Sequence, residues 1–134
     1  GMPMLYTGQE VGFNHPFEFF DRDTVMPTPL NNEFTTFYET LNALKHRNKA
    51  LRAHASADNT VFTPALSNDV ITMTRTAPEG GKVVVIANLS NEPVTLDYGK
   101  NKAPDVTGLS NIFTGESAVI PTELKPWQYL LFAD

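Results

Sequence analysis

The stretch VITMTRTAPEGGKVVVIAN, residues 70–88, sets the fold of the second half of the chain. Two β-prone runs, residues 70–73 and 83–86, flank the turn sequence Pro78-Glu79-Gly80-Gly81. Paired glycines between such runs are typical of a β-hairpin turn, and this pair lacks the pattern of a phosphate-binding loop. Thr72 and Thr74 alternate with apolar residues, as a sheet with one solvent-facing side requires. We therefore predict an antiparallel hairpin here.

Further short β-prone runs lie on both sides of this hairpin, with Gly, Asn, Asp and Ser turns between them. They are residues 61–62, 94–96, 111–113, 118–120 and 127–132. About seven strands without an intervening helix are typical of a β-sandwich. The sequence therefore predicts a mainly β fold, with an antiparallel sandwich domain over residues 55–134.

Residues 1–54 have a different pattern. The apolar residues 2–7 predict a strand, and residues 8–31, which include three prolines and two glycines, predict a long loop. Apolar residues then recur at three- and four-residue spacing and predict a helix over residues 32–51. Asn31 or Asn32 is placed to cap its first turn. A single β/α unit is therefore expected before the sandwich.

Composition excludes several classes of function. The net charge of -5 provides no positive field for nucleic acid, and zero cysteines exclude disulfides, thiolate catalysis and zinc fingers. The longest aliphatic run, residues 83–87, is far shorter than the ~20 residues of a membrane helix. His15, His46 and His54 lack metal-ligand spacing. We expect no metal, cofactor, nucleic-acid partner or membrane partner, and the compartment stays open.

Five segments, in chain order, resemble family 13 glycoside hydrolases, the α-amylase family. The first three resemble the eighth barrel strand with its loop, a turn in that loop, and the eighth helix: GMPMLYTGQEVG (1–12), FFDRD (19–23) and FYETLNALK (37–45). The other two resemble the hairpin and final strand of the Greek-key C-terminal domain: VVVIANLSNEPV (83–94) and PWQYLL (126–131). The resemblance implies that residues 1–54 are the last unit of a (β/α)8 barrel and residues 55–134 are domain C.

The resemblance also implies a parent enzyme that acts on α-glucans. Its nucleophilic Asp, acid Glu and stabilising Asp come from earlier barrel strands, so this chain is expected to hold no catalytic residue and to be accessory and inactive alone. Asn14-His15-Pro16 resembles the third of these motifs only superficially, since Pro16 replaces the Asp. Gln9 and Glu10, on the loop that faces the active-site end of a barrel, are candidate substrate-binding residues. The alternative for Glu10 is that it caps loop amides.

Two groups of aromatic residues have alternative interpretations. The loop group could stack on sugar rings, but packing under the helix is favoured, because Phe lacks a polar group. Its members are Phe13, Phe17, Phe19 and Phe20. A surface Trp127 would suggest a starch-binding platform, whereas its place before an apolar strand favours packing in the core or at a sheet edge. Asp21-Arg22-Asp23 is interpreted as a surface ion-pair network.

The first strand needs a partner. Unpaired buried backbone groups cost ~1–3 kcal/mol each, so we expect residues 2–7 and the helix 32–51 to bind the upstream barrel or a second copy of the chain, or residues 2–7 to dock on the sandwich. A possible further partner is an α-glucan. The alternative functions are a stand-alone carbohydrate-binding module, for which Tyr98, Trp127 and Tyr129 are the candidates, and a structural or interaction module.

Overall fold

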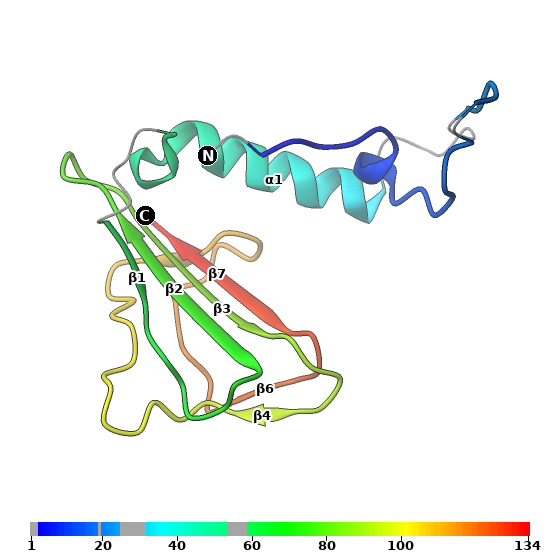
Figure 1. Ribbon diagram of the computed structural model, residues 1–134. Coiled ribbons are helices and arrows are strands. Elements are labelled where there is room, and N and C mark those ends of the chain that lie inside the picture. The colour runs from blue at the N-terminus through cyan, green and yellow to red at the C-terminus, as the bar shows by residue number, and fades with distance from the viewer. Residues whose placement is uncertain (1–2, 19, 25–31, 54–58) are drawn as a thin grey trace. The chain divides into compact units, whose positions relative to one another are not determined.

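The computed structural model describes residues 3–18, 20–24, 32–53 and 59–134. The fold is mainly β with antiparallel sheets, and α1 (Glu33–Arg47) is the one α-helix in that part of the chain (Figure 1). The chain divides into two compact units, Gly1–Leu44 and Lys45–Asp134. The mainly β class predicted from the sequence is therefore confirmed.

The unit Lys45–Asp134 contains two antiparallel sheets. The larger has the strand order β1-β2-β3-β7-β5. Its strands are β1 (Thr60–Phe62), β2 (Val70–Thr76), β3 (Lys82–Asn88), β7 (Tyr129–Ala133) and β5 (Ser110–Asn111). The smaller pairs β4 (Val94–Thr95) with β6 (Glu123–Leu124). Figure 1 shows β3 between β2 and β7, so the predicted hairpin lies at the centre of the larger sheet.

The hairpin of β2 and β3 has the predicted turn. The register runs from Val70 opposite Asn88 to Thr76 opposite Lys82, and the Ala77 amide donates to the Gly81 carbonyl over 3.1 Å. Gly81 has a φ of 104°, and a Cβ there would lie 2.9 Å from Asn48 Oδ1. Glycine is therefore required both by the backbone angle and by the close approach of Asn48.

One face of the larger sheet meets the smaller sheet in the core. The cluster of buried apolar residues is Val84, Ile86, Leu109, Leu124 and Phe132. Thr72, which was expected on the solvent-facing side of the sheet, is instead buried, and its hydroxyl lies 3.0 Å from the hydroxyl of Tyr98. Burial raises the pKa of Tyr98. Tyr98 is thus a core residue, which removes it from the three candidates for a carbohydrate-binding face.

Two strand predictions were wrong in detail. Residues 118–120 form no strand, because Ala118 and Ile120 pack against the core without a ladder partner. The last strand begins at Tyr129 rather than at residue 127, because Trp127 has a φ of 56°, which is incompatible with extended backbone. The short strand β6 has no β-prone run in the sequence and was not predicted.

The predicted helix 32–51 is also too long. α1 ends at Arg47, and Asn48 adopts an extended conformation with φ -88° and ψ 120°. The Asn48 side chain accepts from the Ala50 amide over 2.9 Å and so starts the 3-10 helix η2 (Lys49–Leu51). The same side chain donates to Asp134 Oδ1 over 2.8 Å. These bonds hold Asn48 out of the helix, although the apolar spacing continues through Leu51.

The strand predicted over residues 2–7 is not formed at the positions that the structure describes, residues 3–7. Met4, Leu5 and Tyr6 are 79%, 41% and 58% exposed, respectively. A strand requires a second strand to bond its backbone, and no such pairing reaches this segment within the described chain. The sequence pattern is that of a strand, but the pairing that would make it one is not present.

Replacement of Leu124 by alanine tests whether the two sheets share one core. Leu124 of β6 is fully buried beside Phe132 in the core cluster, so we expect the free energy of unfolding to fall by about 2–5 kcal/mol. Val119→Ala, at a side chain that is 72% exposed, is the control and is expected to change it by less than about 0.5 kcal/mol. Urea unfolding measures both. Equal effects of the two substitutions would contradict a shared core.

Candidate functional site

The two candidate substrate-binding residues lie on one tight turn. Gln9 and Glu10 belong to the 3-10 helix η1 (Gln9–Val11). The Gln9 Oε1 atom accepts from the Tyr6 amide over 2.7 Å, and Glu10 Oε2 accepts from the Gly8 amide over 2.9 Å. Glu10 therefore caps a loop amide, as the alternative interpretation expected. A role for either side chain in binding substrate stays a prediction.

This turn is tied to the start of α1. Asn32 donates from Nδ2 to the Val11 carbonyl over 2.9 Å, and the Thr35 hydroxyl donates to the Glu10 carbonyl over 2.8 Å. Asn32 Oδ1 accepts from the Thr35 amide over 3.0 Å, which is the N-cap bond. Asn32 is thus confirmed as a cap, whereas Asn31 lies outside the described residues. One asparagine side chain starts the helix and holds the turn.

Aromatic residues of the loop pack against one another. The ring centroid of Phe17 lies 5.9 Å from that of Tyr6 and 5.7 Å from that of Phe13. The rings of Phe13 and His15 meet edge to face at 5.6 Å. Phe13 and Phe17 therefore pack within the loop, and their packing under the helix stays a prediction. Phe20 is 93% exposed and departs from this prediction, and Phe19 lies outside the described residues.

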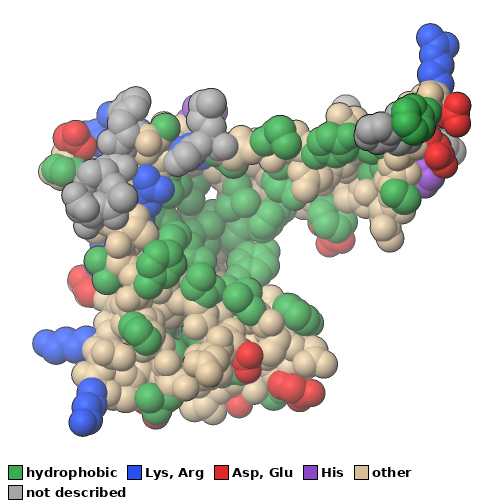
Figure 2. Space-filling view, in the orientation of Figure 1, with side chains coloured by type: hydrophobic (Ala, Val, Ile, Leu, Met, Phe, Trp, Pro, Cys, Tyr) green, Lys and Arg blue, Asp and Glu red, His purple; other side chains and the backbone are tan. Residues whose placement is uncertain are grey.

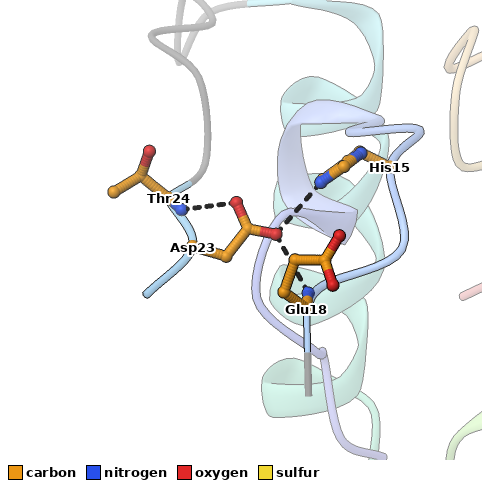
Figure 3. A network of polar contacts seen from close by, with 4 residues as sticks. All are labelled: His15, Glu18, Asp23 and Thr24. Atoms are coloured by element: carbon orange, nitrogen blue, oxygen red, sulfur yellow. Dashed lines mark hydrogen bonds and ion pairs between the residues drawn. The ribbon is translucent and has the colours of Figure 1, made fainter. Parts of the chain in front are cut away.

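A polar network closes the same loop around Asp23 (Figure 3). Asp23 Oδ2 accepts from the Glu18 amide over 3.1 Å and lies 3.0 Å from His15 Nε2, while Oδ1 accepts from the Thr24 amide over 2.8 Å. These bonds, that of the Glu18 amide above all, hold the pKa of Asp23 below its ordinary value. Asp23 therefore pairs with His15, and in the described chain the expected ion pairing with Arg22 is not found.

A shallow hollow lies at the tip of the β2–β3 hairpin. It has a volume of about 250 Å³ and is lined by residues at the start of η2, by Gly80 and Gly81, and by Asp134. Lys49 Nζ beside it donates to the Glu79 carbonyl over 3.1 Å, and the buried Asn48 uses its side chain within the fold. Ligand sites usually measure about 300–1,000 Å³, so this hollow is smaller than a typical ligand site.

The described residues offer no metal site, no membrane-spanning helix and, on the face drawn in Figure 2, no charged patch. In the part of the chain that the structure describes, no three His, Asp or Glu side chains come together as metal ligands. The helices there are also too short or too polar to cross a membrane. On the face drawn in Figure 2, acidic and basic side chains are scattered and do not gather into one patch.

Trp127 is the feature that departs most from expectation. Its side chain is 62% exposed, so the prediction that it packs in the core or at a sheet edge was wrong. The Gln128 amide donates to the Lys125 carbonyl over 3.1 Å and closes a four-residue turn with Pro126 second and Trp127 third. Proline second and a positive φ third define a type II turn, whose third position favours glycine. Trp127 is the one residue other than glycine with a positive φ among those described.

Hydrogen bonds connect the turn around Trp127 to neighbouring segments. The Trp127 amide donates to the Ser90 carbonyl over 3.0 Å, and Gln128 Oε1 accepts from the Lys125 amide over 2.8 Å. Beneath it, the Asn88 side chain is 1% exposed and donates to the Lys125 carbonyl over 3.0 Å. An exposed indole is thus held on a turn whose backbone groups are bonded to β3 and to the segment after it.

No protein-family model matches the chain, and no curated protein matches it. The resemblance to the α-amylase family therefore stands on the sequence segments alone.

Sequence reasoning missed two arrangements that the structure brings together. The pairing of His15 with Asp23 spans eight residues of loop, and no residue spacing announces it. The exposed Trp127 had a signal, because Lys125-Pro126 before it reads as the start of a turn rather than of a strand. The apolar run that follows Trp127 outweighed that signal.

The low pKa of Asp23 is expected to survive the loss of its histidine partner. Two backbone amides still bond the carboxylate in His15→Ala, so Asp23 should continue to titrate below its ordinary value. The network then stabilises the loop above the ordinary pKa of Asp, and this stabilisation is lost as pH falls through the lowered value. Carboxyl-carbon NMR titration measures it. An ordinary or raised Asp23 pKa in His15→Ala would show that the histidine alone causes the shift.

Substitution of Trp127 by glycine and by alanine distinguishes the effect of the backbone angle on stability from the effect of losing the ring. Both remove the indole, but only glycine accepts a φ of 56° without the ~1–2 kcal/mol that the left-handed region costs other residues. Its greater freedom in the unfolded chain offsets about 0.5–1 kcal/mol of this gain. We expect Trp127→Gly to exceed Trp127→Ala in free energy of unfolding by about 0.5–1 kcal/mol. Urea unfolding with the order reversed would argue against strain at Trp127.

Proposed function

We propose that the chain is the C-terminal part of an α-amylase-like glycoside hydrolase that acts on α-glucans. Residues 1–54 are then the last β/α unit of its barrel, and residues 55–134 are the Greek-key sandwich of domain C. The part stabilises the enzyme and is not catalytic on its own. The ordered resemblance of five segments supports this proposal, and the mainly β unit Lys45–Asp134 is compatible with it.

The single observation that carries the β/α part of the proposal is the bonding between the first turn and α1. Thr35 and Asn32, at the start of the helix, hold the carbonyls of Glu10 and Val11. A β/α unit is expected to have such an arrangement, because the loop after a strand and the start of the next helix lie at the same end of the barrel. That end is where barrel enzymes bind substrate, so Gln9 and Glu10 remain candidates for the rim of the sugar site.

Chemistry explains why the part is proposed to be inactive alone. Retaining glycoside hydrolysis uses two carboxyl groups about 5–5.5 Å apart on either side of the glycosidic bond. Glu10 and Asp23 are instead each bonded to amides of their own loop. The proposed catalytic pair belongs to earlier barrel strands, and this chain supplies the rim and the support.

The exposed apolar segment at residues 3–6 indicates the proposed partner. In the parent enzyme, this segment pairs with neighbouring barrel strands, which covers Met4 and Leu5 and satisfies the backbone. In the isolated chain, a second copy takes that place. The helix α1 contributes the other surface of the same partner site.

Activity of a longer version tests the proposed function. We expect the sequence encoded directly upstream to contain an in-frame Asn-His-Asp motif, and the longer protein to release reducing sugar from soluble starch. Purified residues 1–134 are expected to release none. Starch hydrolysis by residues 1–134 alone, or an upstream sequence without barrel strands, would refute the proposal.

Native mass tests the proposed partner site. Residues 1–134 are expected to self-associate through residues 3–6, so their mass by light scattering exceeds that of one chain. Leu5→Lys should shift the equilibrium to the monomer, because a buried lysine disfavours the pairing. Val119→Lys, on an exposed side chain of the other unit, should leave the mass unchanged. A monomeric wild-type chain would remove the second copy as partner.

A further inference from the structure

We propose that Trp127 is a stacking platform for a glucose ring of an α-glucan. The stacking role follows from the turn described above, and the choice of an α-glucan rests on the proposed function. The platform consists of Trp127 on the turn of residues 125–128, whose Trp127 amide donates to the Ser90 carbonyl of the turn of residues 90–92. Trp127 belongs to the unit Lys45–Asp134, whereas Gln9 and Glu10 belong to the unit Gly1–Leu44.

Exposure and backbone angle together single out Trp127. The indole is 62% exposed, and its backbone occupies the left-handed region at a turn position that favours glycine. Strain of this kind persists only where the surrounding structure enforces it, and it gathers at ligand sites. Core packing does not explain a tryptophan here, because most of the ring faces solvent.

The backbone that carries the ring is held by hydrogen bonds, which favours binding. The Trp127 amide is bonded to Ser90, and the Lys125 carbonyl to the buried side chain of Asn88. The Asn88 side chain also donates to the Glu92 carbonyl over 2.7 Å, so both turns are fixed to the end of β3. A turn whose backbone is already bonded loses less conformational entropy when a ligand binds to it.

The chemistry around the ring suits a sugar. A pyranose has an apolar face of C–H groups, which stacks on an indole, and an edge of hydroxyl groups, which requires donors and acceptors. Asn91, Glu92 and Lys125 are exposed on the two bonded turns and supply both. The net charge of -5 disfavours phosphate-bearing ligands that also stack, such as nucleic acid.

The fluorescence of the chain reports directly on this site, because Trp127 is its only tryptophan. Titration of residues 1–134 with maltoheptaose is expected to shift the emission to shorter wavelength and to protect the indole from quenching by acrylamide. Cellohexaose, which has the same sugar with β-linkages, should produce a smaller change. No response to maltoheptaose, or an equal response to cellohexaose, would overturn the proposal.

Variants are compared by their retardation in native gels that contain amylose. Trp127→Gly relieves the backbone strain and keeps the fold, and we expect it to weaken retardation by about tenfold, as removal of a central binding aromatic does. Trp127→Phe should retain part of it. Phe62→Ala, at a ring that is 61% exposed on β1, is the matched control and should migrate as the wild type does.

The outcomes separate this proposal from the proposed function. Undiminished retardation of Trp127→Gly, or a fall in native mass with that variant, would overturn the platform, the second result in favour of a protein interface. If the longer protein hydrolyses starch while maltoheptaose leaves Trp127 unchanged, the platform fails and the proposed function stands. If maltoheptaose binds at Trp127 but the longer protein acts on no α-glucan, the proposed function fails and the platform stands.

Discussion

The pairing of β3 with both β2 and β7 is the constraint on which the rest of the β-rich unit depends. It places Val84 and Ile86 on the face that meets Leu124 of the smaller sheet, so one strand fixes both the larger sheet and the core. At its end, β3 supplies Asn88, whose buried side chain binds two turns. The strand therefore positions the exposed tryptophan as well as the hydrophobic interior, and stability and the proposed binding surface share one origin.

Asparagine side chains mark the other boundaries of the fold in the same way. Asn32 starts α1 and holds the turn before it, and Asn48 ends the helix and starts η2. In each case the amide group replaces a backbone partner that regular structure no longer provides. Asparagine side chains thus stand at both ends of α1, and sequence spacing alone does not reveal which asparagine does so.

The hairpin, the mainly β class and the Asn32 cap were predictable because each depends on local chemistry. Paired glycines between β-prone runs, and an asparagine before an apolar helical repeat, act within a few residues. The pairing of His15 with Asp23 was not predictable, because no residue spacing announces a contact across eight residues of loop. The exposure of Trp127 had a local signal in Lys125-Pro126, but the apolar run after Trp127 outweighed that signal. The strand predicted over residues 2–7 is absent at residues 3–6 for a third reason. A strand forms only when a second segment pairs with it, and the sequence pattern describes one segment alone.

The bonds of Asn48 have a mechanical consequence. Its amide group donates to the Asp134 carboxylate, which also accepts from the Lys82 amide over 2.9 Å at the start of β3. Tension applied to the chain at Arg47 therefore reaches β3 and β7 first through these side-chain bonds and through the contact of η2 with the sheet. Asn48 and Asp134 therefore connect the chain after α1 to adjoining ends of β3 and β7 through side-chain bonds that lie outside the strand ladders.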